Sequence, residues 1–227
     1  MTRLPALMHS DDWDADVPSP VDLRLARDAR EWEATAFTKR PCRARFLDAF
    51  VAEVVSSGLS APRILELGSG PGFMAQRLLE AVPGARYTLL DFSAEMHRLA
   101  AARLGEQAGR AKFVVADLRQ ARWTDGLGPF DFVVTLQAVH ELRHKRHALR
   151  LHAAVRALLA QGGRYLVCDH YAGEGGMTND RLFMTADEQR RTLASAGFAG
   201  VSLVLKEGGL ALHRAGQGHR MRVVPGR

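Results

Sequence analysis

Hydrophobic residues along this chain fall into short unbroken runs and into longer stretches where they recur every three or four residues. The runs predict five strands: one ending at Glu66, then 86–90, 112–115, 130–136 and 164–168. The helical spacing predicts helices between them: one ending near residue 82, one over 93–105 and one from 151 to a stop at Gly162-Gly163. This alternation predicts an α/β fold, a doubly wound and mostly parallel sheet with helices on both faces.

The C-terminal part of the chain predicts one more helix and a hairpin. Thr185 and Glu188 form a capping-box pattern for a helix that reaches about Ala196. Two short apolar runs, 201–205 and 210–213, are joined by the turn Glu207-Gly208-Gly209. We expect this hairpin to add one antiparallel strand at the edge of the sheet.

The segment before the first strand predicts two helices, over 21–37 and from Pro41 to Gly58. They are interpreted either as packing elements or as a lid over a ligand site. Residues 1–20 are polar and acidic and contain three prolines, which predicts a flexible arm. The chain thus divides into the arm 1–20, the helices 21–58, a main domain 59–214 and a basic tail 215–227.

Composition narrows the class of protein. The chain has 227 residues, of which 47% are apolar and 25% charged, the balance of a globular protein. No apolar run reaches the ~20 residues that span a bilayer, and the acidic N-terminus has no signal core. Cys42 and Cys168 stand far apart, which disfavours a disulfide framework. We therefore expect a reducing, cytoplasmic setting and no membrane.

The net charge of +6 is compatible with a nucleic-acid partner. Only four of the 31 basic residues are lysines, and an arginine-rich composition can also reflect the base composition of a genome. Nucleic acid is therefore an alternative partner that we do not favour, and the oligomeric state is left open.

The first predicted strand runs directly into the turn Gly68-Ser69-Gly70-Pro71-Gly72, and a helix follows. Glycine permits positive φ and lets a ligand approach the backbone, while the amides here favour anionic ligand groups. In the dinucleotide fingerprint G-x-G-x-x-G, the third glycine would stand at Phe73. The acid Glu66 also precedes the first glycine by two residues, so the turn departs from that fingerprint.

Acidic residues end four of the predicted strands: Glu66, Asp91, Asp117 and Asp169. In an open parallel sheet, ligands bind beyond the carboxyl ends of the strands. The sequence therefore predicts a ligand site with several carboxylates at this edge.

Three segments together resemble the class I S-adenosylmethionine-dependent methyltransferases. They are the glycine turn with its acid (65–72), Leu90-Asp91-Phe92-Ser93-Ala94-Glu95-Met96, and Val114-Val115-Ala116-Asp117-Leu118. The resemblance covers roughly residues 60–214. It implies a Rossmann-like sheet, S-adenosyl-L-methionine as cofactor, and in-line methyl transfer to a small-molecule acceptor.

The resemblance also implies roles for individual residues. Asp91 would bind the ribose hydroxyls, and Glu66 would help to orient the ammonium group of the cofactor. Asp117 would meet the adenine amino group beside the backbone of Leu118. The remaining implied contacts are Phe92 and Met96, flanking the adenine, and Gly68, Ser69, Gly70 and Gly72, near the methionine part. A methionine at helical spacing is also typical of a core.

The segment 133–142 ends the fourth strand, and in that family it borders both cofactor and acceptor. It contains Gln137, expected beside the cofactor, and His140. It is not the Asn/Asp-Pro-Pro-Tyr motif and is closer to the hydrophobic-His-x-Leu variant of small-molecule methyltransferases. His140 is therefore the candidate general base. The alternative is a partly buried histidine bonded to a loop carbonyl.

His140-Glu141-Leu142-Arg143-His144 also matches the zinc-protease pattern H-E-x-x-H. That motif needs both histidines on one helix face and a third ligand, whereas His140 stands at the end of a predicted strand, so we expect no metal. The basic residues that follow are interpreted as a solvated helix face, or as a surface that attracts an anionic substrate or RNA: Arg143, Lys145, Arg146 and Arg150.

Asp169, His170 and Tyr171 end the fifth strand and are candidates for the acceptor pocket or a plain turn. The sequence thus favours a methyltransferase acting on a small molecule. The alternatives are an RNA or protein methyltransferase, and a cofactor-binding partner subunit without transferase activity.

Overall fold

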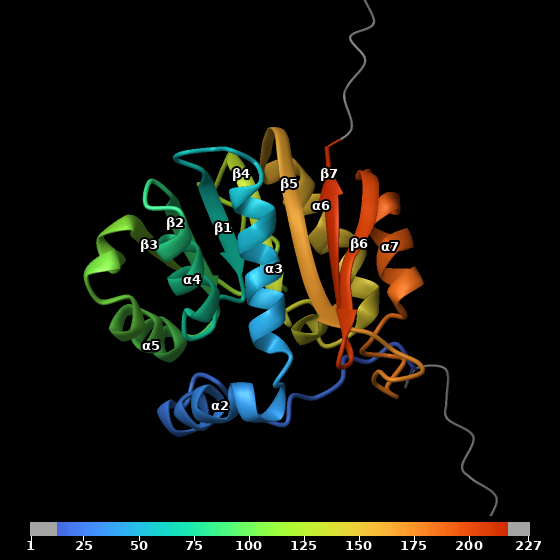
Figure 1. The fold of residues 1–227 in the computed structure, drawn as a ribbon. Helices are drawn as coiled ribbons and strands as arrows, with labels where there is room; N and C mark the ends of the chain where they lie inside the picture. The colour runs from blue at the N-terminus through green and yellow to red at the C-terminus, as the bar shows by residue number, and fades with distance from the viewer. Residues whose placement is uncertain (1–12, 218–227) are drawn as a thin grey trace, which may run out of the picture.

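The computed structural model describes residues 13–217, so the start of the expected arm (1–12) and the end of the expected tail (218–227) lie outside the described residues. A seven-stranded sheet has the order β3-β2-β1-β4-β5-β7-β6 (Figure 1). Strands β1 to β5 are parallel, and β7 runs antiparallel to both β5 and β6. The strands are β1 Arg63–Leu67, β2 Arg86–Asp91, β3 Ala111–Val115, β4 Phe130–Leu136, β5 Leu159–His170, β6 Ala199–Glu207 and β7 Leu210–Gly216.

Helices cover both faces of the sheet, as the alternating pattern predicted. One core packs α3, α4 and α5 against one face, and the other packs α6 and α7 against the opposite face. β1 supplies both, with Ile64 in the first core and Leu65 in the second. The helices are α2 Ala26–Lys39, α3 Arg43–Val55, α4 Phe73–Ala81, α5 Ala94–Leu104, α6 Ala148–Leu158 and α7 Ala186–Ser195. No described helix has the length and hydrophobicity needed to cross a bilayer.

The helix ends predicted from capping residues are confirmed. Ser93 Oγ accepts a hydrogen bond from the Met96 amide at 3.2 Å, at the start of α5. Thr185 and Glu188 form the complete capping box of α7. Gly105 follows the last residue of α5, with φ at +52°.

Two predictions about the C-terminal half are wrong. The glycine pair Gly162-Gly163 does not end a helix, because α6 ends at Leu158 and the pair lies within β5. Here β4 and β5 shift register, and a Cβ on Gly163 would lie 3.0 Å from the carbonyl oxygen of Phe130. The antiparallel strand is also not at the edge: β7 is inside, and β6 forms the edge.

The burial of the two hairpin strands explains this order. Leu210, Ala211 and Leu212 of β7 are fully buried, whereas Leu203 of β6 is half exposed. An inner strand is paired along both edges, and the side chains of β7 enter the helix-covered cores on both faces of the sheet, so the more apolar strand occupies this position.

Residues 13–20, expected to be part of a flexible arm, instead lie against the loop after β4. The amide of Val17 donates to the carbonyl of Arg143 at 2.7 Å. The guanidinium of Arg143 donates to the carbonyls of Val17 and Pro18 at 2.8 and 2.7 Å. We call residues 13–25 the N-terminal strap.

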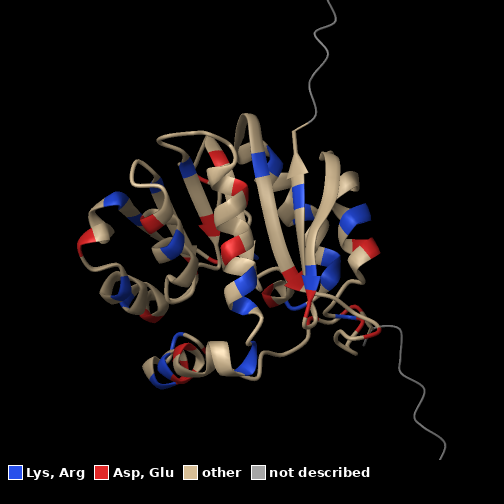
Figure 2. Cartoon of the chain, viewed as in Figure 1, with Lys and Arg blue, Asp and Glu red and all other residues tan. Residues whose placement is uncertain are grey.

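The basic cluster after β4 is therefore not simply a solvated helix face. Arg143 is buried beneath the strap, and Arg146 pairs with Asp16 of the strap at 3.3 Å. Figure 2 shows the acidic segments at the lower, carboxyl ends of β1 and β5, the edge at which the sequence predicted a ligand site.

Candidate functional site

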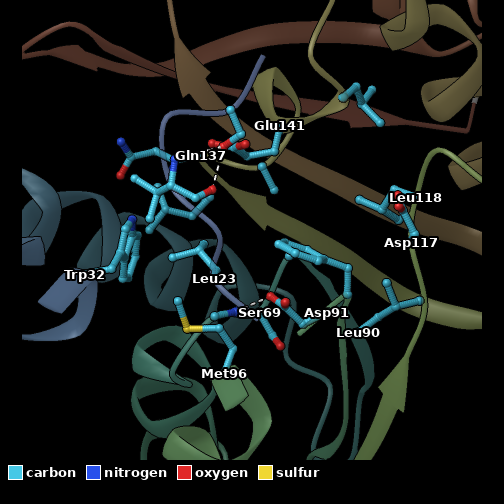
Figure 3. A pocket seen from close by; sticks show the side chains of 18 of the residues that line it. Leu23, Trp32, Ser69, Leu90, Asp91, Met96, Asp117, Leu118, Gln137 and Glu141 are labelled. Carbon is cyan, nitrogen blue, oxygen red and sulfur yellow. Dashed lines mark hydrogen bonds between the residues drawn. The ribbon is translucent and has the colours of Figure 1, made fainter. Parts of the chain in front are cut away.

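A cavity of about 330 Å³ opens at the carboxyl ends of β1, β2 and β4. Its walls come from the loops after these strands, from the N-terminal strap, and from α2 and α3 (Figure 3). Its volume is within the range of about 300–1,000 Å³ that is usual for small-molecule sites. Most of the predicted cofactor residues line it: Glu66, Gly68, Ser69, Gly70, Asp91, Phe92, Met96, Asp117, Leu118 and Gln137.

The three glycines of the turn differ in whether they line the cavity and in which neighbour they pack against. A Cβ on Gly68, where φ is +63°, would lie 2.4 Å from Cβ of Ala138, so glycine is needed for the close approach of the β4 loop. Gly70 faces the cavity. Gly72 is not among the cavity residues, and a Cβ there would lie 3.0 Å from Cβ of Ala100 in α5. The structure thus shows a close packing contact at Gly72, and the ligand contact that the resemblance implied stays a prediction.

Asp91 ends β2 and presents a buried carboxylate to the cavity. Its Oδ2 accepts a hydrogen bond from the Gly70 amide at 2.8 Å, and its Oδ1 accepts one from the Ser93 amide at 2.9 Å. Burial raises the pKa of Asp91, although these backbone bonds oppose the rise. The bonds fix the carboxylate beside the glycine turn (Figure 3).

Glu66 forms a buried pair with a tyrosine that the sequence analysis did not identify. The Tyr87 hydroxyl donates to Glu66 Oε2 at 2.9 Å, and both side chains are buried. Burial raises the pKa of Glu66 to about 8. This carboxyl group is consequently mostly neutral at pH 7 and would ionise beside a cationic ligand group.

Several apolar side chains line the cavity near the ends of β2 and β3: Leu90, Phe92, Met96 and Leu118. We call this part of the cavity the apolar slot, and Asp117, from the loop after β3, also lines the cavity. The hydrogen bond from Arg119 lowers the pKa of Asp117, so the acid is ionised. Such a slot suits a flat ring that carries a hydrogen-bond donor on its edge.

The strap closes this slot from the other side. Leu23 lines the cavity, and the guanidinium of Arg24 lies 4.6 Å from the ring centre of Phe92. Ser93 Oγ also donates to the carbonyl of Leu23 at 2.5 Å. The strap is therefore part of the cavity wall.

Gln137 follows β4 with an unusual backbone, φ +59°. Its Nε2 donates to Nε2 of His170 at 2.7 Å, and burial lowers the pKa of His170 to about 4, which keeps that ring neutral. Within residues 13–217, the buried atoms Gln137 Oε1 and Ser69 Oγ have no hydrogen-bond partner. Because buried polar groups are normally paired, these atoms indicate ligand contacts.

His140 does not lie where a general base is needed. It is not among the cavity residues, and it begins a 3₁₀ turn, His140–Leu142, beyond the end of β4. Its Nδ1 lies 2.6 Å from Asp169 Oδ1, and its Nε2 lies 3.2 Å from Glu141 Oε1. Although burial opposes it, the Asp169 carboxylate raises the pKa of His140 to about 10. With its pKa raised and both ring nitrogens facing carboxylates, His140 favours the protonated form, and this arrangement does not favour a general base.

The candidates at the end of β5, Asp169, His170 and Tyr171, are not among the residues that line this cavity. Asp169 also accepts hydrogen bonds from the backbone amides of His140 and His170, each at 2.7 Å. His144 Nε2 lies 3.0 Å from the carbonyl oxygen of Trp13. Over residues 13–217 there is no cluster of side chains with the composition of a metal site.

The sequence did not identify several other groups in the wall, among them Trp32 of α2, Arg43 of α3 and Glu141. The sequence contains one pattern that could have predicted the burial of Arg43. Arg43 stands three residues before Phe46 and four before Leu47, so a charged residue occupies the apolar stripe of its helix.

Comparison with known proteins places this site in context. A family profile described as "Methyltransferase domain" matches residues 64–163. The chain is 30% identical over 194 residues to malonyl-[acyl-carrier protein] O-methyltransferase of Geobacter sulfurreducens, across 78% of this chain and 69% of that protein. It is 40% identical over 95 residues to trans-aconitate 2-methyltransferase of Streptomyces avermitilis, across 41% of this chain and 34% of that protein.

A solved structure, the complex of DhpI with S-adenosylhomocysteine, has the same fold with a TM-score of 0.66 and 23% identity. The similarity covers 86% of this chain and 94% of that one.

Proposed function

Since this chain belongs to the class I S-adenosylmethionine-dependent methyltransferases, we propose that it methylates an oxygen of a carboxylate. The acceptor would be a small organic acid, either free or held as an acyl thioester. The observation that carries this proposal is that the described residues of the cavity wall include no histidine, lysine, cysteine or tyrosine that could serve as a general base.

The described cavity residues fit the methyl donor. Asp91 would bind the ribose hydroxyls, Glu66 the ammonium group, and Asp117 the edge of the adenine in the apolar slot. The unpaired atoms of Ser69 and Gln137 support this assignment, since a polar ligand would satisfy them. When bound, S-adenosylmethionine supplies a methyl group that its sulfonium already activates.

The kind of acceptor follows from the side chains around it. Among the described residues that line the cavity there is no histidine, lysine, cysteine or tyrosine. A phenol, an alcohol or an acidic carbon would need a base with a pKa near the working pH. Glu141 lacks one, because the hydrogen bonds from His140 and Arg143 keep its pKa low against the effect of burial. Glu66, with a pKa of about 8, is held by the Tyr87 hydroxyl and is assigned in this proposal to the ammonium group of the cofactor. A carboxylate acceptor has already lost its proton and needs no base.

Two relatives support the same chemistry. Malonyl-[acyl-carrier protein] and trans-aconitate, the acceptors in their names, are both carboxylic acids. What this chain's residues must then do is hold an anion, align it and exclude water. The strap over the cavity suits the exclusion of water. The wall contains four arginines, Arg24, Arg43, Arg119 and Arg143. Arg119 and Arg143 already pair with Asp117 and Glu141, so Arg43 suits the binding of an anion best.

The test is an acceptor screen with purified protein, S-adenosylmethionine and mass spectrometry. One set contains small di- and tricarboxylic acids and malonyl thioesters; the matched set contains their amides, phenols and amines. We expect methyl esters, identified by their release of methanol in alkali, and a rate that stays flat as the pH rises above the pKa of the acceptor acid.

Methylation of phenols or amines alone would contradict the carboxylate proposal. Methylation of RNA or of a protein would favour the alternative macromolecular substrates. Binding of S-adenosylhomocysteine without turnover on any acceptor would favour a cofactor-binding partner subunit.

A further inference from the structure

A second cavity, of about 630 Å³, lies at the amino ends of β1 to β4, at the end of the sheet opposite the first cavity. Strands rise about 3.3 Å per residue, so the lengths of β1 and β2 separate the two cavities by roughly 15–20 Å. Its volume is also in the range usual for small-molecule sites. The proposed methyl transfer makes no use of this amino-end cavity.

The connections between the strands explain why the sheet is open at this place. The helices α4 and α5, which join β1 to β2 and β2 to β3, both pack on the face that contains Ile64. The segment 116–129, which joins β3 to β4, contains no helix. On the opposite face, the last residues of this segment border the cavity instead of a helix: Gly126, Leu127, Gly128 and Pro129.

The described residues that line the amino-end cavity include four basic side chains and no acidic one: Arg63, Arg86, Arg110 and Lys112. Arg63 and Arg86 stand directly opposite each other on neighbouring strands. Lys112 is opposite Thr88, two residues after Arg86, so its side chain points to the same face of the sheet. Like charges on adjacent strands repel each other, and the fold concentrates positive charge here.

Two of the four cations have partners that hold them in place. Arg63 pairs with Asp131 at 3.0 Å. Arg110 donates to the carbonyls of Leu79 and Pro83, each at 2.9 Å, at the C-terminal end of α4. These carbonyls fix the guanidinium of Arg110, but they carry no formal charge that would cancel its own.

The other two cations have no carboxylate partner. Within residues 13–217, neither Arg86 nor Lys112 forms an ion pair, and both residues are exposed. Arg98 shows the contrasting case, an exposed arginine that pairs with Glu95 at 3.0 Å. The amino-end cavity therefore holds more positive charge than its surroundings neutralise, and an anion in it would offset the repulsion.

The rim of the cavity leaves room for such an anion. A Cβ built on Gly109 or on Gly126 would meet no atom within 4 Å. Gly109 also has no positive φ, so neither space nor backbone conformation requires a glycine there. This position can therefore carry a side chain as a probe of the site.

We propose that the amino-end cavity binds a small molecule that carries a polyphosphate group. Guanidinium and ammonium groups match phosphate oxygens in charge and in hydrogen bonding, and several phosphates are needed to neutralise several cations. A nucleic-acid strand would need basic residues that continue beyond the cavity. Arg122, in the bordering segment 116–129, is instead already paired with Asp125 at 2.7 Å. This site does not depend on the proposed function.

The experiment is calorimetric titration of the full chain with inorganic triphosphate, with and without saturating S-adenosylhomocysteine. The test variants are Arg86→Gln and Lys112→Gln, singly and combined. The matched control combines Arg98→Gln with Arg191→Gln. It removes the same number of charges from exposed positions on α5 and α7 that line neither cavity.

The wild type should bind inorganic triphosphate, more weakly as the salt concentration rises, and S-adenosylhomocysteine should not compete. Each single substitution should weaken binding on the order of tenfold, and the combined variant should lose more. The control should change by less than about twofold, because distant surface charges are screened. Gly109→Glu should abolish binding, since it adds a carboxylate at the rim. All variants should bind S-adenosylhomocysteine like the wild type.

Thermal unfolding gives a second readout. Triphosphate should raise the Tm of the wild type and leave that of the combined variant unchanged. Without ligand, Arg86→Gln should melt no lower than the wild type, because it removes a repulsion with Arg63.

Three results would overturn the proposal. The first is no binding of triphosphate. The second is displacement by S-adenosylhomocysteine, which would put the anion in the first cavity. The third is an equal loss in the combined variant and its control, which would indicate a general effect of net charge. Binding of a short mixed-sequence RNA without binding of triphosphate would also contradict it, and would assign this surface to nucleic acid.

Discussion

Replacing His140 with asparagine tests the chemistry and the stability of the site together. The substitution keeps a polar side chain but removes the imidazolium between Asp169 and Glu141. The rise in its pKa from 6.5 to about 10, at about 1.4 kcal/mol per pKa unit, corresponds to roughly 5 kcal/mol. Removing one partner of a buried ion pair generally costs about 3–5 kcal/mol.

We expect the lower end of this range, about 3 kcal/mol, because Asp169 keeps its two backbone hydrogen bonds. For a chain of this size, that loss lowers Tm by roughly 6–12 °C. The sign of the pH dependence is fixed. Because folding raises the pKa of His140, its stabilisation is complete below about pH 6.5 and is lost as the pH rises through about 10. The Tm difference between wild type and variant should shrink over that window.

The rate of methyl transfer should respond differently from the stability. Since His140 is not placed as a base, the single-turnover rate should fall less than about tenfold, compared with about 10²- to 10⁴-fold for the loss of a general base. The assay is single turnover at a temperature where both proteins are folded, with Asp169→Asn as the partner variant in a double-mutant cycle. A hundredfold loss of rate with unchanged Tm would refute this reasoning and restore His140 as the base.

Three further predictions follow from the site and its supports. In the wild type, calorimetry should show the affinity for S-adenosylhomocysteine rising as the pH approaches about 8, where Glu66 ionises, and Glu66→Gln should abolish this pH dependence. Because folding raises the pKa of Glu66, the unliganded wild type should lose stability as the pH rises from about 4.5 to about 8. Gly68→Ala should lower the free energy of unfolding, measured in urea, by about 2–4 kcal/mol, because the new Cβ clashes with Ala138 and the backbone has a positive φ. The control Gly58→Ala also lies at positive φ but in open space, and should lose only about 1–2 kcal/mol. Equal losses in the two variants would contradict the clash. Thr185→Ala should lose about 1 kcal/mol with kcat unchanged, because it removes only a helix cap.

The sequence predicted those parts of the fold that depend on local pattern. Every parallel strand was found, because each is a short apolar run, and the caps at Ser93 and Thr185 follow local rules. Gly163 was misread as a helix stop, since its glycine serves a close contact with the distant Phe130. A contact between residues so far apart in the chain leaves no periodic signal.

The site also contains residues that a local sequence pattern predicts and residues that only the tertiary structure brings together. Asp91 was predictable because it ends a strand at a fixed distance after the glycine turn, and it lines the cavity. Arg43, Trp32 and the strap enter the wall only because α2 lies beyond the carboxyl ends of the strands and α3, which runs along one face of the sheet, begins at the same end (Figure 1). The protonated state of His140 depends on Asp169, twenty-nine positions along the chain, and no spacing in the sequence indicates that pair.

The place of β7 inside the sheet has a consequence for synthesis of the protein. β7 is the last described strand to leave the ribosome, yet it supplies the pairing edge of both β5 and β6. Until residues 210–216 emerge, β5 has an open edge and β6 has no partner, so the nascent chain exposes two strands that are prone to pair with other chains. The five parallel strands can assemble during translation, but the sheet closes only afterwards. A ribosome that stalls before Leu210 therefore leaves a chain whose cavity-forming half is complete and whose other half is a target for chaperones.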